Sequence, residues 1–277
     1  MILVSLLLLV LAILGAPLFA IIATSAMVGF HNSDTDLMMI GLELMSIAQM
    51  PILTAIPLFT FAGYLLSESK APQRLVRLTN AMFGWMPGGL ALVCLAACAF
   101  FTAFTGASGV TIIALGAILY PALKQDGYSD RFNLGLVTSS GSLGLLFAPS
   151  LPLILYGVVA EVSIDDLFRA GILPGIVMLV MLSGYSIWVN RDNRKPVASF
   201  SLREVGAALR EAIWELPLPI VVLGGIYSGF FAVSEAAAIT ALYVFIAEVL
   251  INREIRFRDL PRITRDSMVL VGGILMI

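Results

Sequence analysis

The sequence predicts an all-α polytopic membrane protein. Apolar residues make up 60% of its 277 positions and charged residues 12%, whereas a soluble domain carries about 25% charged residues. The mean hydropathy is +1.00, and a water-soluble fold of this length has too little interior to enclose so much apolar surface. We therefore expect membrane lipid to cover much of the protein. The net charge of −2 is uninformative, and no basic tract suggests a nucleic-acid partner.

A membrane-spanning helix needs about 20 apolar residues. The apolar blocks, in chain order, are residues 2–30, 50–67, 81–123, 132–160, 170–189, 217–251 and 268–277. We interpret the first block as a membrane helix, because it has no basic start and is too long for a cleavable signal. The block at 217–251 is long enough for two crossings, with a break near residues 232–235.

The charges of the polar segments predict the orientation of the chain. The basic segments, which we assign to the cytoplasm, are residues 67–77, 191–203 and 252–266. The acidic segments, which we assign to the periplasm, are residues 31–36 and 161–169. We therefore expect Arg194 and Arg258 to face the cytoplasm, and Asp34 and Asp165 to face the periplasm.

With this orientation, residues 81–123 must enter and leave the membrane on the cytoplasmic side, so they form a helical hairpin. Its midpoint is Thr105-Gly106-Ala107-Ser108-Gly109. Small polar residues there favour a re-entrant tip, because irregular backbone at membrane depth persists only where protein or water satisfies it. Whether the arms stop in mid-membrane or reach the far surface is left open.

A second unusual segment runs from Thr138 to Pro152 and combines small polar residues with two prolines. Pro149 and Pro152 flank Ser150 inside an apolar block, so they remove backbone hydrogen bonds and break the helix. Freed carbonyl groups in a membrane cost several kcal/mol unless something uses them. Coordination of sodium by carbonyl and hydroxyl oxygens is one use, and half-helix N-termini directed at an anionic substrate are another.

No Asp or Glu occurs in residues 81–123 or 132–160. This pattern favours coupling through neutral oxygen ligands over a carboxylate proton relay. The alternative is that the small residues only permit close helix packing. We prefer that alternative for isolated glycines, namely Gly84, Gly88, Gly171 and Gly175. For the apex and the helix break we prefer a role in binding, because close packing alone does not explain two breaks at corresponding depth.

Several other residues have structural interpretations. Residues 72–83 and 202–214 mix charged and apolar residues at helical spacing and predict interfacial amphipathic helices. Cys94 and Cys98 lie one helical turn apart and are expected to pack in the core. Among the carboxylates, Glu43 is expected near the outer interface, and Glu235 is expected to cap the helix starting at Ala236.

The sequence offers one weak indication of an enzyme. Residues 106–109 fit the G-x-S-G pattern of rhomboid-type intramembrane serine proteases, whose serine needs a histidine base on a later helix. The only histidine is His31, which precedes the serine in an acidic segment that we interpret as a solvated loop. We therefore expect a transporter rather than an enzyme.

Short motifs along nearly the whole chain resemble one family of transporters. The motifs are residues 56–63 (IPLFTFAG), 88–91 (GGLA), 105–109 (TGASG), 127–128 (GY), 131–132 (RF), 140–144 (SGSLG), 148–150 (APS), 156–157 (YG) and 234–238 (SEAAA). In this order they resemble the large membrane subunit, DctM-like, of tripartite ATP-independent periplasmic (TRAP) transporters. The usual first break of that family reads P-P-S, where this chain has Ala148-Pro149-Ser150.

The resemblance implies an elevator-type fold of two inverted repeats, each contributing a hairpin and a broken helix. It implies sodium-coupled import of organic anions, such as dicarboxylates or sugar acids, across the bacterial inner membrane. Its expected partners are a periplasmic substrate-binding protein and a small four-helix membrane subunit, with sodium as the coupling ion and no other cofactor. The implied sodium- or substrate-binding residues are Thr105, Gly106, Ser108, Gly109, Ser140, Gly144, Pro149 and Ser150. We also expect Ser108 and Ser150 to approach each other near mid-membrane.

The same resemblance divides the chain into four parts. These are N-terminal scaffold helices (1–80), a transport-domain hairpin and broken helix (81–160), a scaffold span with an interfacial arm helix (161–216) and the incomplete start of a second repeat (217–277). Because the family is longer, we expect either a fragment or a truncated gene. We further expect that these residues alone do not catalyse coupled transport, because such carriers hold substrate between two hairpins and two broken helices.

Two other functions stay open at this point. One is a sodium- or proton-coupled permease of the wider ion-transporter superfamily that works without a binding protein. The other is a truncated remnant that does not transport. The particular organic anion is not readable from the sequence.

Overall fold

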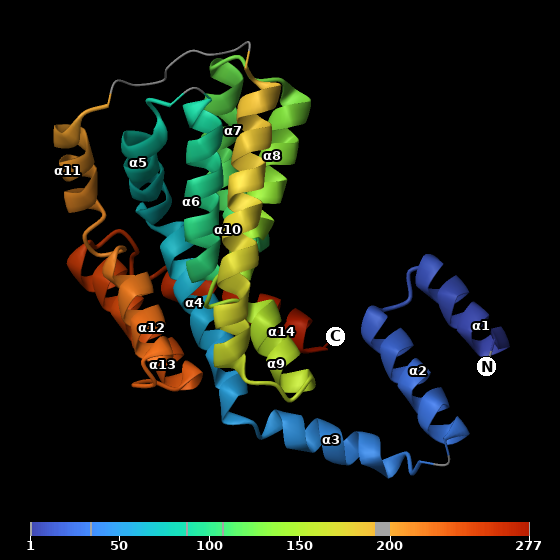
Figure 1. Ribbon diagram of the computed structural model, residues 1–277. Helices are drawn as coiled ribbons and strands as arrows, with labels where there is room; N and C mark the ends of the chain where they lie inside the picture. The colour runs from blue at the N-terminus through green and yellow to red at the C-terminus, as the bar shows by residue number, and fades with distance from the viewer. Residues whose placement is uncertain (1, 34, 87, 107, 192–199, 277) are drawn as a thin grey trace.

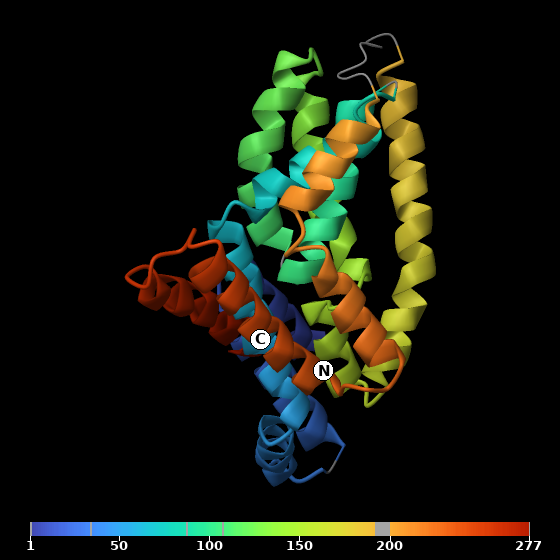
Figure 2. The ribbon, with the colours of Figure 1, turned by 90° about the vertical axis from the view of Figure 1, so that its left-hand side faces the viewer.

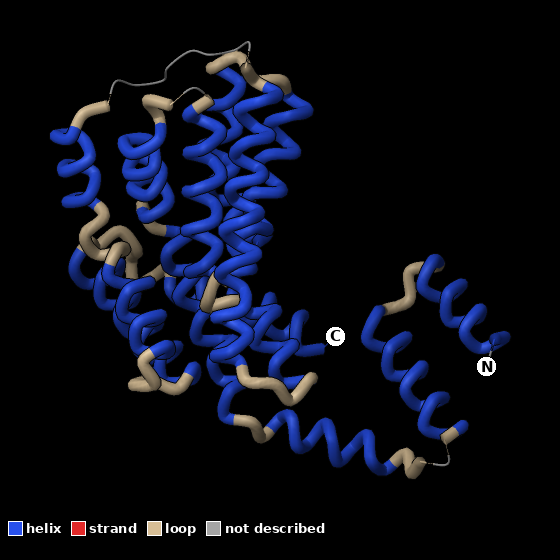
Figure 3. Tube along the Cα trace, in the orientation of Figure 1, coloured by secondary structure: helices blue, strands red, loops and turns tan. Residues whose placement is uncertain are grey.

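The computed structural model describes residues 2–33, 35–86, 88–106, 108–191 and 200–276. All regular structure within these ranges is helical, and they contain no strand (Figure 1, Figure 3). The all-α prediction is therefore confirmed. The orientation predictions for Asp34 and Arg194, and the apex residue Ala107, lie outside the described residues.

The first apolar block forms two helices instead of the single one predicted. Helix α1 (Ile2–Ile13) ends before Gly15, which has a φ of +89°, and α2 (Leu18–Asn32) begins after Pro17. Pro17 has no backbone N–H and disfavours helical geometry in the residue before it, so the helix cannot continue. His31 lies in the last turn of α2, not in a loop. Helices α1 and α2, followed by α3 (Met38–Ala48), stand apart from the other helices (Figure 1).

The central part of the protein contains the predicted hairpin and the predicted broken helix. Helix α4 (Ala55–Glu68), preceded by the 3-10 turn η1 (Pro51–Thr54), packs beside the hairpin arms α6 (Gly89–Thr105) and α7 (Ser108–Gln125). The broken helix consists of α8 (Asp130–Leu143), the short η2 (Gly144–Leu146) and α9 (Leu151–Val159). Its two halves are bent by 47°.

The C-terminal helices follow the prediction in outline. After α10 (Ile164–Val189), the apolar block 217–251 divides into α12 (Pro217–Tyr227) and α13 (Val233–Phe245), which continues into the π-helical η3 (Ile246–Ile251). The Glu235 carboxylate accepts a hydrogen bond of 3.0 Å from the Ala232 amide, so its capping role is confirmed. The helix nevertheless starts at Val233, three residues before the predicted position. The last helix, α14 (Leu260–Met276), already begins within the basic segment 252–266.

The structure contains enough long apolar helices for a multi-pass membrane protein. By length and composition, the described residues contain four candidate membrane spans. The number rises to five if the two halves of the broken helix together count as one span. The four are Pro51–Glu68, Ser108–Gln125, Ile164–Val189 and Val233–Ile251, and the two halves of the broken helix are Asp130–Leu146 and Leu151–Val159.

The two predicted amphipathic segments are both helical. They are α5 (Ala71–Phe83) and α11 (Leu202–Glu211), which lie side by side in both ribbon views (Figure 1, Figure 2). A small apolar cluster joins them through Leu78, Ala208 and Ala212.

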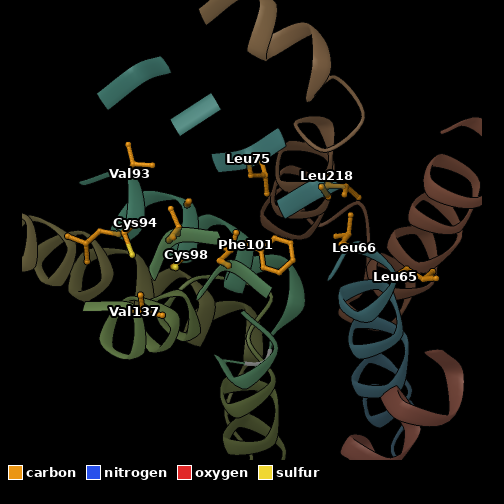
Figure 4. Packing of buried hydrophobic residues seen from close by; sticks show 14 of the residues in the cluster. Leu65, Leu66, Leu75, Val93, Cys94, Cys98, Phe101, Val137 and Leu218 are labelled. Carbon is orange, nitrogen blue, oxygen red and sulfur yellow. The ribbon is translucent and has the colours of Figure 1, made fainter. Parts of the chain in front are cut away.

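The main hydrophobic core surrounds α6 (Figure 4). Cys94 and Cys98 are fully buried there and are free thiols, as their predicted packing role requires. The packing role of Gly171 is also confirmed, because a Cβ there would lie 2.3 Å from the Leu146 carbonyl oxygen. Gly88 differs, since its φ of +74° belongs to the turn before α6.

One buried ion cluster connects α5 to distant parts of the chain. The Arg74 guanidinium donates hydrogen bonds of 2.6 Å to Glu215 and 2.6 Å to Glu254, and lies 3.2 Å from Glu248. Both Glu215 and Glu248 are 1% exposed. Burial raises the pKa of the Glu215 carboxyl, and Arg74 opposes that shift. The sequence did not predict either buried carboxylate.

Candidate functional site

The hairpin apex packs directly against the break in the second helix. Gly106 ends α6 with a φ of +62°, and its amide donates a 2.8 Å hydrogen bond to the Thr102 carbonyl oxygen. A Cβ on Gly106 would lie 2.9 Å from Leu151 Cγ and 3.5 Å from the Pro149 carbonyl oxygen. The two irregular segments that the sequence singled out are thus in contact.

Beside the apex, three buried threonine hydroxyls form a cluster with a backbone carbonyl of α8. Thr102 Oγ1 lies 2.8 Å from Thr111 Oγ1 and 3.0 Å from the Gly141 carbonyl oxygen. Thr105 Oγ1 lies 3.2 Å from Thr111 Oγ1. The three threonines are at most 1% exposed. Neutral oxygen atoms from both hairpin arms and from the broken helix therefore converge on one place.

Glycines bring the backbones close enough to form this cluster. A Cβ on Gly144 would lie 2.3 Å from Thr102 Cβ and 2.7 Å from the Ala99 carbonyl oxygen. On the other side of the hairpin, a Cβ on Gly63 of α4 would lie 2.6 Å from Thr105 Cα. Real Cβ atoms do not approach this closely, so neither position has room for a larger residue.

The hydroxyl of Ser150 is buried without a hydrogen-bond partner among the described residues. Ser150 is the N-cap residue of α9 and is fully buried. An N-cap serine normally accepts a hydrogen bond from the amide of the second or third helical residue, and here the second is Pro152, which has none. The preceding Ala148–Pro149 peptide is cis. A buried unpaired hydroxyl costs about 1–3 kcal/mol, so a ligand at Ser150 would relieve that cost.

A cavity of about 270 Å³ lies next to the apex. Its walls include Gly106, Ser108, Gly109, Leu151, Pro152 and, from α14, Ile274. Ser108 and the first residues of α9 thus line the same cavity, whereas Ser150 is buried and is not part of its wall. The predicted approach of Ser108 to Ser150 stays a prediction.

Two of the predicted residues stand apart from the cluster. Ser140 Oγ donates a 3.1 Å hydrogen bond to the Val137 carbonyl and lies 3.7 Å from Cys94 Sγ. The neighbouring Gly141 contributes its carbonyl to the cluster, but the Ser140 hydroxyl itself contacts Cys94 and not the threonines. Gly109 is exposed, and a Cβ there would meet nothing within 4 Å.

Thr102, Thr111 and the Gly141 carbonyl were not among the predicted site residues. Their signal was nevertheless present: Thr102 and Thr105 are three residues apart and therefore share one face of α6. Thr111 comes one turn after the apex on the opposing arm. A threonine pair on one arm facing a threonine on the other predicts a hydroxyl cluster once the hairpin is assumed.

Comparison with known proteins gives a consistent result along the chain. Residues 2–277 match the family described as tripartite ATP-independent periplasmic transporter, DctM component. The chain is 36% identical over 230 residues to the C4-dicarboxylate TRAP transporter large permease protein DctM of Rhodobacter capsulatus, covering 77% of this chain and 52% of that protein.

Other relatives are named for different substrates. The chain is 34% identical over 278 residues to the ectoine/5-hydroxyectoine TRAP transporter large permease protein UehC of Ruegeria pomeroyi, covering 97% of this chain and 63% of that protein. It is 31% identical over 249 residues to the 2,3-diketo-L-gulonate TRAP transporter large permease protein YiaN of Escherichia coli, covering 89% and 59%. The chain spans between 52% and 63% of the length of these three relatives.

Proposed function

Since this chain belongs to the DctM component family of TRAP transporters, we propose that it is part of a large permease subunit that imports a small organic solute across a bacterial inner membrane. The resemblance noted in the sequence is thereby confirmed, and the family is one of transporters and not of enzymes. The contact between the hairpin apex and the helix break supports a transport site here, together with the adjacent Ser150 hydroxyl, which has no partner among the described residues.

The proposed substrate is a solute that carries a carboxylate. The three relatives are named for a C4-dicarboxylate, for ectoine and for 2,3-diketo-L-gulonate, all of which are carboxylates. In this chain, Ser150 is the N-cap of α9, so the N-terminus of that helix lies beside the apex. The positive end of a helix dipole and unpaired amide groups favour a negative group at such a position.

The proposed coupling ion is sodium. The residues that would hold it supply neutral oxygens: the hydroxyls of Thr102, Thr105, Thr111 and Ser150, and the Gly141 carbonyl. This donor set suits a hard monovalent cation, and the orphaned Ser150 hydroxyl provides a ligand without breaking an existing hydrogen bond. Bound sodium would add positive charge beside the proposed carboxylate site. Residues 81–160 would then form the transport domain.

The proposed partners are a periplasmic substrate-binding protein and a small four-helix membrane subunit. The family assignment supports them over a permease that works without a binding protein. In addition, no residue of α2 or α3 is buried, although both helices are largely apolar. Their surfaces are available to lipid and to the small subunit.

A chimera tests the function. In it, this chain is followed by the C-terminal part of the Rhodobacter capsulatus relative and reconstituted with that system's small subunit and binding protein. We expect saturable uptake driven by an inward sodium gradient, and none from the 277-residue chain alone. A folded, assembled chimera that shows no uptake of any carboxylate under the gradient would contradict the proposal.

Replacing Ser150 by alanine is expected to weaken sodium binding about tenfold, the loss that corresponds to about 1.4 kcal/mol. The change removes one oxygen ligand from a buried position without adding volume. The measurement is the sodium dependence of thermal unfolding in detergent, with choline as the replacement cation. Ser142→Ala is the matched control, because Ser142 lies on α8 but is exposed. Equal sodium responses of both variants and the wild type would remove Ser150 from the site.

A further inference from the structure

A second cavity, of about 360 Å³, lies between α8 and α10. Its lining residues run from Ser129 to Ser139 along α8 and from Leu182 to Val189 along α10. The start of α8 and the end of α10 lie at the same end of the helix bundle (Figure 1). Its wall includes Ser129, Arg131 and Ser186 as polar residues, and Phe132, Leu136 and Leu182 as apolar ones. The cavity therefore presents both polar and apolar groups to one ligand.

The lengths and aromatic residues of the helices lead us to expect the Arg131 side of the cavity near the depth of the lipid head groups. Helix α10 has 26 residues and is about 39 Å long at 1.5 Å per residue, which exceeds the roughly 30 Å hydrocarbon core. Near its C-terminal end, Tyr185 and Trp188 are 55% and 65% exposed, and their rings lie 6.3 Å apart. Exposed Tyr and Trp side chains mark the membrane–water interface. Tyr185 itself borders the cavity.

Arg131 supplies the positive charge of the cavity wall. Arg131 has no ion pair among the described residues, whereas the nearby Lys124 is paired with Asp130 at 3.1 Å. An unpaired guanidinium presents several N–H donors in a geometry that matches phosphate oxygens. A negatively charged ligand is therefore the chemical complement of this end of the cavity.

A second, independent observation comes from Ser186. Its side chain is fully buried, borders the cavity, and has no hydrogen-bond partner for its hydroxyl among the described residues. A serine inside a helix usually bonds the carbonyl four residues earlier, which Ser186 does not do. An ester or phosphate oxygen of a ligand in the cavity would satisfy this hydroxyl.

We propose that this cavity binds an anionic phospholipid, with its phosphate at Arg131 and its glycerol ester region at Ser186. The acyl chains follow the apolar wall at Leu136 and Leu182 out to the surface of α10. A lipid is favoured over a soluble anion because only 11% of the most apolar part of α10 is buried, so the cavity continues into a surface that lipid covers. Basic pockets between membrane helices on the cytoplasmic side are a known form of lipid head-group site.

The test uses the whole chain, delipidated in detergent. Phosphatidylglycerol is expected to raise the midpoint of thermal unfolding by several degrees, phosphatidylcholine to raise it much less, and native mass spectrometry to show retained phosphatidylglycerol. Arg131→Gln should lower the apparent affinity for phosphatidylglycerol about tenfold, and Ser186→Ala should lower it by a smaller factor. Arg210→Gln is the matched control, because it removes the same charge from the exposed face of α11, away from the cavity.

Three results would overturn the proposal. One is equal stabilisation by the two lipids. Another is an unchanged lipid response in both the Arg131 and the Ser186 variants. If one of these two variants does not fold, the lipid response of the other decides the question. The third is that glycerol 3-phosphate at millimolar concentration reproduces the effect and displaces the lipid only in wild type, which would assign the cavity to a soluble anion.

Discussion

Replacing Arg74 by glutamine is expected to destabilise the protein by about 3–5 kcal/mol, because buried carboxylates would lose their counter-charge. Glu215 and Glu248 are each 1% exposed and cannot gain water in exchange for the guanidinium. For a chain of this size, the loss corresponds to a fall of roughly 10 °C in the midpoint of thermal unfolding. Circular dichroism in detergent, followed during heating, measures it.

A matched control lies three residues further along α5. Arg77 also pairs with two carboxylates, those of Glu204 and Glu211, but its side chain is 41% exposed. Surface ion pairs of this kind contribute little, since water replaces the lost partner. Arg77→Gln should therefore unfold close to the wild-type temperature. Similar losses in the two variants would show that burial is not what makes the Arg74 cluster important.

The Arg74→Gln variant should also regain stability on acidification. Burial raises the pKa of Glu215, and removal of Arg74 raises it further, because the guanidinium acts to lower it. A carboxyl whose pKa is higher in the folded state binds its proton more tightly there, so stability is lost as the pH rises through that pKa. As the pH falls below the raised pKa of Glu215 toward the ordinary carboxyl range, the deficit relative to wild type should shrink. A deficit that does not depend on pH would point to lost packing instead of unpaired charge.

The second large effect is expected for Gly144→Ala. The new methyl group would meet Thr102 Cβ at 2.3 Å and the Ala99 carbonyl oxygen at 2.7 Å, and backbone cannot move aside as a flexible side chain does. Overpacking of this kind costs about 1–3 kcal/mol. It would also push α8 away from α6 and break the 3.0 Å hydrogen bond between Thr102 and the Gly141 carbonyl. We expect a lower unfolding temperature and loss of its sodium dependence.

Gly184→Ala provides the comparison for that variant. Gly184 lies within α10, and a Cβ there would meet nothing within 4 Å. Alanine is favoured over glycine inside a helix by up to about 1 kcal/mol, so this variant should be as stable as wild type or slightly more so. A Gly144→Ala protein that keeps both its stability and its sodium response would mean that the threonine cluster is not required for binding.

The hairpin and the break could be predicted because their causes are local in sequence. Gly106 permits a left-handed turn, and Pro149 and Pro152 interrupt a helix wherever that helix lies. The amphipathic pattern of α5 and α11 is similarly visible within one stretch of chain. Which threonines meet at the apex depends instead on how the two arms pack, so the predicted site residues included Thr105 but not Thr102 or Thr111.

The buried carboxylates illustrate the other limit. Glu248 stands in an apolar block and Glu215 just before it, and nothing near either residue compensates its charge. Their partner is Arg74, which lies 141 residues before Glu215 and 174 before Glu248. Pairing over such separations is not encoded in any local pattern. The wrong prediction of a single helix over residues 2–30 had a different origin. Pro17 was visible in the sequence, but the apolar block was long enough to suggest one membrane span.

The same separation sets an order of events during synthesis. Arg74 leaves the ribosome 141 residues ahead of its first partner, a delay on the order of ten seconds at about 5–20 residues per second. During that interval, none of the three carboxylates that pair with Arg74 has yet been synthesised. The hairpin, the broken helix and α10 are synthesised in the same period. The buried ion cluster that connects α5 to the later helices can therefore be completed only after the segment containing Glu254 has been translated.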